Sequence, residues 1–282
     1  MNVLITGGTG QLGFDIVAKL KSLNIDISAP THNELDITNQ VEVAHIFEQY
    51  KPTVVIHCAA FTAVDAAEDN QKLCDDININ GTKYLAQEAA KCGAKFVYIS
   101  TDYVFDGQGT GAYKVTDKPN PINYYGRSKL AGETIVQDIL SKYFILRISW
   151  VFGLNSKNFV KTMIDLGSKY DEIKVVDDQY GSPTYTHDVA ELISDMIITN
   201  EFGIYHVTNE GICSWCEFAK KIFECAKLSC RVQGIPSSEY PTKAVRPFNS
   251  RLDKSSLEQH GFKRLPKWED ALQRYLEELE VI

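Results

Sequence analysis

Tyr125 and Lys129 have the residue types and the spacing of a proton-transfer pair. Side chains four residues apart on a helix lie on the same face, so a lysine ammonium at this spacing can approach the phenol. A free phenol has a pKa of about 10, which is too high for easy proton exchange near neutral pH. A nearby positive charge favours the ionised form, and we therefore expect Lys129 to lower the pKa of Tyr125. Such a pair predicts a proton donor for a substrate carbonyl.

The segment around Tyr125 carries more information than the spacing alone. Tyr170 and Lys174 have the same spacing, but they span the predicted end of a helix and the start of a strand, where the two side chains need not face each other. Before Tyr125, the segment 120–123 (Asn-Pro-Ile-Asn) supplies a turn and a helix cap, and residues 126–137 follow with helical periodicity. An isolated match is more often a surface tyrosine beside a solvated lysine, so the surrounding elements decide the interpretation.

Composition and charge are those of an ordinary soluble globular protein. The chain has 282 residues, of which 44% are hydrophobic and 23% charged, and this length suffices for a full core. The net charge of −8 argues against a nucleic-acid partner, which needs a basic surface. No run of about 18 apolar residues predicts a membrane span. The start lacks the basic and long apolar segments of a signal peptide, so we expect a cytoplasmic protein.

The seven cysteines, scattered from Cys58 to Cys230, do not make a disulfide framework in a chain of this length, and we interpret them as reduced thiols. Cys213 and Cys216 form a CxxC motif, which raises zinc as an alternative. However, Cys216 belongs to a predicted amphipathic helix with Ser214 as its cap, and the spacings to the later cysteines fit no standard zinc module. We therefore predict no metal ligands.

Strands and helices alternate through the first half of the chain. The predicted strands are 3–6, 26–29, 53–57, 95–100 and 144–149, and the predicted helices are 10–23, 40–50, 70–91 and 124–140. Strands that are apolar throughout and separated by helices indicate a parallel sheet covered on both faces. The predicted fold class is therefore α/β, with a doubly wound parallel-sheet Rossmann fold.

Beyond Trp150 the alternation loosens, and we predict a smaller C-terminal substrate-binding lobe. The expected elements are helices 158–166, 186–198, 215–227 and 268–279, strands 173–176 and 204–207, and a proline-rich loop with Pro236, Pro241 and Pro247. We assign residues 1–152 to a dinucleotide-binding Rossmann domain and residues 153–282 to the smaller lobe. Its segments are expected to interleave with the last elements of the sheet.

A glycine-rich segment from Gly7 to Gly13 lies between the first predicted strand and the first predicted helix. Glycines at such a turn allow backbone amides to approach a diphosphate at the helix N-terminus. The predicted dinucleotide contacts in this part of the chain are Gly7, Gly10, Gln11, Leu12 and Gly13, followed by Ala59, Ala60 and Phe61 after the third strand.

The end of the second predicted strand bears on the choice between NAD and NADP. An acidic residue there usually binds the ribose 2′-hydroxyl, but residues 28–32 contain none. Thr31 and His32 could donate hydrogen bonds to a 2′-phosphate, whereas Asp36, followed by Ile37, lies later and is better placed near the adenine. We therefore expect NADPH to be used at least as well as NADH.

The fourth predicted strand leads into Thr101, and the carboxyl ends of parallel strands line the ligand crevice, so Thr101 should lie near Tyr125. A glycine-rich first turn, a strand-end threonine and a downstream Tyr-x-x-x-Lys together resemble the extended short-chain dehydrogenase/reductase family. Within it, the chain is most similar to the dTDP-4-dehydrorhamnose reductases. The similarity covers essentially the whole length, through segments 100–105, 125–133, 147–153, 178–184 and 246–252.

The resemblance implies NAD(P)H-dependent reduction of the C4 keto group of dTDP-4-dehydro-β-L-rhamnose to dTDP-β-L-rhamnose, for rhamnose-containing cell-surface polysaccharide. Tyr125 would protonate the carbonyl oxygen, Lys129 would bind the nicotinamide ribose, and Thr101 would hydrogen-bond the same oxygen. The implied substrate contacts are Thr101, Asp102, Tyr125, Trp150 and Asn158, together with Arg246 and Arg251 as candidates for the diphosphate. A structural ion pair with a carboxylate is the alternative role for each arginine.

Other members of this superfamily supply the alternatives. Sugar-nucleotide dehydratases carry an Asp-Glu pair after the strand-end threonine, whereas Tyr103 follows Asp102 here, which argues against elimination. An epimerase would use the same tyrosine and lysine but keep its cofactor bound, and a regulatory subunit would bind a partner without catalysis. The residues do not separate a thymidine nucleotide from a uridine nucleotide.

Some relatives dimerise through magnesium held by acidic residues, one of which follows the glycine-rich turn. Asp15 occupies that position here, and the sequence supplies no convincing downstream partners. A homodimer and a magnesium ion therefore stay open alternatives.

Overall fold

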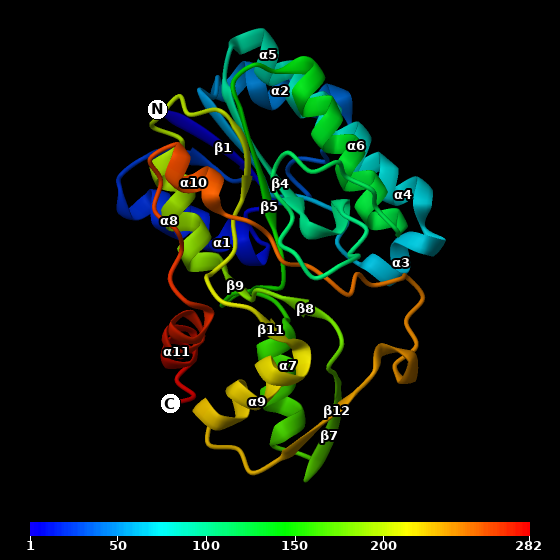
Figure 1. Cartoon of the computed structure of the whole chain (residues 1–282). Coiled ribbons are helices and arrows are strands. Elements are labelled where there is room, and N and C mark those ends of the chain that lie inside the picture. Colours follow the sequence, from blue (N-terminus) through cyan, green and yellow to red (C-terminus); the bar gives the residue numbers. More distant parts are fainter.

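In the computed structural model, which describes residues 1–282, a six-stranded sheet forms the centre of the larger of two lobes (Figure 1). Its strands are β1 (Asn2–Thr6), β2 (Asp26–Ser28), β3 (Val54–His57), β4 (Lys95–Thr101), β5 (Tyr143–Ile148) and β10 (Gly203–His206). They lie in the order β10-β5-β4-β3-β1-β2, and every neighbouring pair is parallel. The predicted doubly wound α/β fold is confirmed.

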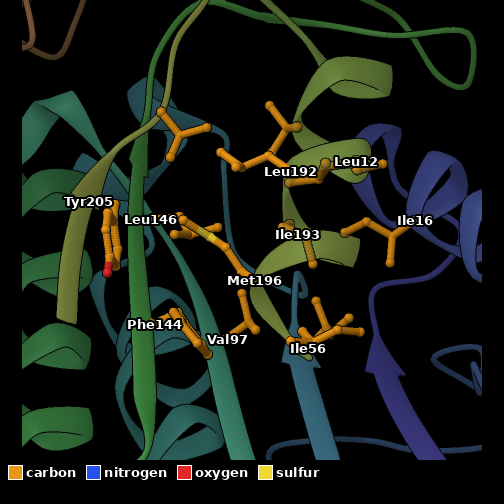
Figure 2. Packing of buried hydrophobic residues seen from close by; sticks show 14 of the residues in the cluster. Leu12, Ile16, Ile56, Val97, Phe144, Leu146, Leu192, Ile193, Met196 and Tyr205 are labelled. Carbon is orange, nitrogen blue, oxygen red and sulfur yellow. The ribbon is translucent and has the colours of Figure 1, made fainter. Parts of the chain in front are cut away.

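Helices cover both faces of this sheet (Figure 1). On one face lie α1 (Gln11–Ser22) and α8 (Thr186–Met196), and on the other lie α2 (Gln40–Tyr50), α5 (Thr82–Cys92) and α6 (Tyr124–Ile139). Figure 2 shows the first of these interfaces, in which side chains of α1 and α8 pack against side chains of the strands. The helices contribute Leu12, Ile16, Leu192, Ile193 and Met196, and the strands contribute Ile56, Val97 and Leu146. Complete burial of each such side chain stabilises the fold by about 1.5–3 kcal/mol.

The predicted single helix over residues 70–91 is wrong at its N-terminal half. The chain forms α3 (Val64–Asp69), α4 (Gln71–Asp75), a π-helical segment (Asp76–Gly81) and then α5. Asn78, in the π-helical segment, is buried and bonded on both sides of its amide: Oδ1 accepts from the Phe61 amide at 2.8 Å, and Nδ2 donates to Ser128 Oγ at 2.9 Å. These contacts join the segment to the loop after β3 and to α6, and they depend on tertiary packing that periodicity does not record.

The smaller lobe is built from three helices and several short strands (Figure 1). The helices are α7 (Phe159–Gly167), α9 (Trp215–Cys225) and α11 (Trp268–Glu278), and their apolar faces share one core that includes Phe152, Tyr185 and Phe218. The strands form three pairs: β6 (Val151–Phe152) with β9 (Thr184–Tyr185), β7 (Glu172–Val176) with β12 (Arg231–Ile235), and β8 (Tyr180–Gly181) with β11 (Cys213–Ser214). Of these strands, only β7 is predicted from the sequence.

Segments late in the chain return to the larger lobe. Strand β10 is the last strand of its sheet, and helix α8 packs on one face of that sheet. Helix α10 (Ser255–Gln259) adds Leu257 to the core between α8 and the sheet. The stretch 240–253 runs from β12 back to the larger lobe and passes near α3 (Figure 1). The boundary at residue 152 stays a prediction. None of the helices combines the length and the apolar composition that crossing a membrane requires.

Helix α6 lies against β4 through Gly132, and this contact gives a test of the fold. A Cβ atom at Gly132 would lie 2.1 Å from Tyr98 Oη and 3.0 Å from the Asn78 carbonyl oxygen. Gly132→Ala should therefore lower the free energy of unfolding by about 1–3 kcal/mol in a denaturant titration. Gly111→Ala is the matched control, because no atom lies within 4 Å of the place that a Cβ would take there. Equal effects of the two substitutions would contradict the close approach.

Candidate active site

A cavity of about 640 Å³ lies at the carboxyl ends of β1, β3, β4 and β5. The glycine-rich turn lines one part of it, Tyr125 and Lys129 line another, and Trp215 of the smaller lobe contributes to the wall. Its volume is in the range of small-molecule sites. The position agrees with the rule that open parallel sheets bind ligands beyond the carboxyl ends of their strands.

The glycine-rich turn has the geometry of a diphosphate site. Gly7 has φ of +71°, and a Cβ there would lie 2.6 Å from the Ala59 amide nitrogen. A Cβ at Gly13 would lie 2.1 Å from the Gly7 carbonyl oxygen, so only glycine permits this packing of turn against helix. Helix α1 begins directly after Gly10 with no side-chain cap, which leaves its first amides free for an anion. The predicted residues Gly7, Gly10, Gln11, Leu12 and Gly13 all line the cavity.

The other predicted cofactor contacts divide into two groups. Those that line the cavity are His32, Asp36, Ile37, Ala59 and Ala60. Thr31 does not line the cavity; its amide and its hydroxyl both donate to the Glu34 carboxylate, each at 2.8 Å. Phe61 does not line the cavity either, and its backbone amide donates to Asn78 Oδ1. Sequence reasoning about the end of β2 considered only residues 28–32 and therefore missed Glu34, although its contact with Thr31 spans only three residues.

Thr101, Tyr125 and Lys129 meet in the cavity as predicted from their order in the chain. The predicted cap of α6 is confirmed: Asn123 Oδ1 accepts from the Gly126 amide at 2.8 Å. The Tyr103 ring stands edge-on to the Tyr125 ring, with centroids 5.9 Å apart. Lys129 is only 2% exposed, and its Nζ lies 4.1 Å from the centroid of the Tyr98 ring. The ammonium is therefore held against an aromatic face.

The expected effect of Lys129 on the pKa of Tyr125 is wrong for this structure. Burial, and then the Asp102 carboxylate, raise the pKa of Tyr125 well above its ordinary value, and the Thr101 hydroxyl only opposes the rise. Burial also lowers the pKa of Lys129 to about 7, against the attraction of Glu133. Desolvation thus outweighs the pairing of the two groups. The phenol keeps its proton at neutral pH, as a proton donor requires.

Asp102 is a buried carboxyl in the wall of the same cavity. Its Oδ2 accepts from Ser250 Oγ at 2.5 Å, and its Oδ1 accepts from Thr101 Oγ1 at 3.1 Å. Burial raises the pKa of Asp102 to about 6, and both hydroxyls oppose the rise. Ser250 has no motif of its own, so sequence reasoning missed this link between the stretch 240–253 and the strand-end residues.

Two tryptophans form the wall where the lobes meet. Trp150 has an unusual positive φ of +50°, and its ring stacks on Trp215 with centroids 3.6 Å apart and planes 12° apart. Gly181 packs against the Trp150 ring so closely that a Cβ atom there would lie 2.7 Å from Trp150 Cε2. The predicted substrate contact Trp150 lines the cavity, and so does Trp215, which the sequence did not predict. Trp215 is the first residue of α9 and lies far from Trp150 in the sequence, so only the packing of the two lobes brings it to the cavity.

Asn158, Arg246 and Arg251 do not line the cavity. Asn158 caps α7, and its Nδ2 donates to Gln11 Oε1 at 3.2 Å, so it joins the smaller lobe to the glycine-rich turn. Arg246 forms the alternative ion pair, with Nη2 2.6 Å from Asp65 Oδ2. Arg251 lies over the Tyr180 ring, with Cζ 4.7 Å from its centroid. The three side chains therefore make contacts within the protein and not at the cavity where they were predicted to meet the substrate.

Neither the Asp15 region nor the CxxC motif has the donor set of a metal site. Asp15 is buried and accepts from the Thr186 hydroxyl, and burial raises the pKa of its carboxyl. Cys213 lies in β11 and Cys216 in α9, where Ser214 and Glu217 form a capping box that confirms the predicted cap. No three His, Cys, Asp or Glu side chains cluster as ligands would. The residues around Asp15 thus do not fit a magnesium ion as they are arranged here.

The charge state of Asp102 gives a test of the site's electrostatics. Because the folded-state pKa is about 6, above the ordinary value of 3.8, this group stabilises the fold at low pH and loses that contribution as pH rises through about 6. Asp102→Asn should therefore raise the free energy of unfolding relative to the unmodified protein by about 3 kcal/mol at pH 8 and by about half of that at pH 5. Urea titrations at both pH values measure the difference, and a pH-independent difference would contradict the assignment.

A family model and two related sequences place the chain in the same family. The sequence model of the RmlD substrate binding domain matches residues 1–281. The spore coat polysaccharide biosynthesis protein SpsK of Bacillus subtilis is 41% identical over 98% of this chain and 97% of its own length. A dTDP-4-dehydrorhamnose reductase of Aggregatibacter actinomycetemcomitans is 41% identical over 96% of both chains.

A solved structure agrees with these sequence relatives. The dTDP-4-dehydrorhamnose reductase of Bacillus anthracis in complex with NADP is 44% identical and superposes with a TM-score of 0.96, covering 98% of this chain and 99% of that one. The agreement extends over both lobes and not only over the larger one. The chain belongs to the RmlD substrate binding domain family, to which the sequence of its glycine-rich turn, strand-end threonine and Tyr-x-x-x-Lys motif had pointed.

Proposed function

We propose that this protein uses NADPH to reduce the C4 keto group of dTDP-4-dehydro-β-L-rhamnose, giving dTDP-β-L-rhamnose for a cell-surface polysaccharide. The observation that carries the proposal is one cavity lined by Thr101, Tyr125 and Lys129 and also by the uncapped start of α1. Relatives that carry the name of this reductase support the substrate, and the solved relative with NADP supports the cofactor. A cytoplasmic location and a homodimer stay predictions.

The residues have complementary roles in this reaction. NADPH, when bound, supplies a hydride to the carbonyl carbon and leaves as NADP⁺. Tyr125 donates its proton to the carbonyl oxygen, so that the C=O group becomes a secondary alcohol, and solvent returns a proton to the phenol. Lys129 holds the nicotinamide ribose beside Tyr125, and Thr101 orients the carbonyl oxygen. The first amides of α1 hold the diphosphate of the dinucleotide.

The residue after Asp102 separates reduction from elimination. Tyr103 lines the cavity where the dehydratase pattern would have a second carboxylate. Burial raises the pKa of Tyr103 to about 12, so its phenol is neutral and cannot act as a carboxylate base near pH 7. Its hydroxyl lies 3.4 Å from Arg246 Nη1, which fixes the side chain. This arrangement favours a reductase over a dehydratase.

Removal of the Tyr125 hydroxyl tests the proposed proton donor. Tyr125→Phe keeps the ring in its contact with Tyr103 but leaves no acidic proton for the carbonyl oxygen. We expect kcat to fall by about two to four orders of magnitude, the range of general-acid catalysis, while the Kd for NADPH changes little. Steady-state kinetics and titration of NADPH fluorescence measure the two quantities. Normal turnover by this variant would refute the proposed mechanism.

The substrate is tested by following NADPH oxidation at 340 nm with dTDP-4-dehydrorhamnose and with its uridine counterpart. We expect turnover with the thymidine nucleotide, and kcat/KM with NADPH at least equal to that with NADH, because residues 28–32 contain no carboxylate. Purified protein that carries tightly bound NAD and needs no added reductant would favour an epimerase. Cofactor binding with no turnover of any keto sugar would favour a regulatory subunit.

A further inference from the structure

We infer that Glu133 is a positioning residue that keeps Lys129 protonated and fixes the strand that carries Thr101. The inference rests on the proposed function, because it takes Lys129 as the group that hydrogen-bonds the nicotinamide ribose, and the protonated form has the full set of three N–H donors for this task. Glu133 lies outside the cavity and touches neither substrate nor cofactor. Its effect is therefore exerted through its neighbours.

Glu133 follows Lys129 by four residues on α6, as Lys129 follows Tyr125. The three side chains therefore lie along one face of the helix. Glu133 is completely buried, and its Oε1 accepts from Ser100 Oγ at 2.5 Å. Ser100 directly precedes Thr101 on β4. A single carboxylate thus joins the helix that carries Tyr125 and Lys129 to the strand that carries Thr101.

A buried arginine balances the charge of Glu133. Arg147 of β5 donates from Nε to Oε1 at 2.9 Å and from Nη2 to Oε2 at 2.7 Å, and it is 2% exposed. Its Nη1 lies 3.4 Å from His206 Nε2, while His206 Nδ1 lies 3.0 Å from the Asp253 carbonyl oxygen. His206 thus donates from Nδ1 and accepts at Nε2, and burial lowers its pKa to about 3, which keeps it neutral. Glu133 is the one carboxylate bonded to Arg147.

Stability alone does not account for this ion pair. Two buried charges lose their hydration, and well-packed apolar residues in the same place are often at least as stabilising. The location of the pair, one helical turn from Lys129, gives it a second effect. A carboxylate near a buried ammonium opposes the loss of its proton, and Glu133 is the largest influence that raises the pKa of Lys129 against burial.

No other neighbour of Lys129 can replace this charge. The titratable groups around it are Tyr125 and Glu133 on α6, Tyr98 on β4, His57 on β3, Cys58 after β3 and Cys74 on α4. Burial lowers the pKa of His57 to about 3, so the imidazole is neutral. Burial also raises the pKa values of the two thiols and the two phenols, so these groups are neutral as well. Glu133 is the only carboxylate among them.

The test is the pH profile of kcat/KM for ketone reduction. In the unmodified protein the activity should fall as pH rises through the pKa of Lys129, about 7 in the free protein. Glu133→Gln removes the negative charge and leaves the Arg147 charge unbalanced, so Lys129 should lose its proton more easily. We expect the basic limb to move to lower pH by about one unit or more. The double variant Glu133→Gln/Arg147→Met removes both charges, and its basic limb should lie between the other two.

Two further variants separate the outcomes. Ser100→Ala removes the bond between Glu133 and β4 but keeps the ion pair, so kcat should fall while the basic limb stays in place. Lys129→Met should lose reduction at every pH; full activity in this variant would refute the proposed role of Lys129 itself, whereas loss of activity here together with an unshifted basic limb in Glu133→Gln would refute the role of Glu133 alone. Circular dichroism establishes which variants fold. If Glu133→Gln alone does not fold, the double variant carries the test, and a basic limb that coincides with that of the unmodified protein overturns the inference.

Discussion

Burial of Lys129, with Tyr125 partly buried beside it, is the constraint on which the rest of the site depends. Near the surface, a lysine four residues from a tyrosine would lower the phenol pKa, whereas here burial raises the pKa of Tyr125 and lowers that of Lys129. Both shifts favour the neutral forms, since a charged group loses more on leaving water than a neutral one. The phenol therefore holds the proton that a reductase must deliver, and the Tyr98 ring and Glu133 support the ammonium.

Residues of both lobes form the wall of this site. The sheet delivers Thr101 and the glycine-rich turn to one edge, but residues of the smaller lobe complete the wall. Trp215 stacks on Trp150, and Asn158 reaches across to Gln11. Helix α8 and strand β10 belong to the larger lobe although they lie between smaller-lobe segments in the chain, so the chain crosses between the lobes more than once.

Local features of the site could be predicted from the sequence, and features that depend on tertiary packing could not. The start of α6 follows from Asn123 and the preceding turn, and the uncapped start of α1 follows from Gly10. In contrast, Trp215 reaches the cavity only when the lobes pack, and Ser250 reaches Asp102 only when the stretch 240–253 returns to the larger lobe. The pKa of Tyr125 shifts in the opposite direction from the prediction, because spacing reports proximity and contains no information on burial.

Two side-chain contacts of different strength hold the stretch 240–253 against the larger lobe. The ion pair between Arg246 and Asp65 is half-exposed, and such pairs contribute only about 0–1 kcal/mol. Ser250, in contrast, donates to the Asp102 carboxylate where both residues are buried. A hydrogen bond to a buried charge contributes about 1.5–3 kcal/mol, so Ser250 rather than Arg246 holds this stretch to the strand end. Arg246 fixes the Tyr103 hydroxyl, and thus both contacts end on residues adjacent to Thr101 in space or sequence.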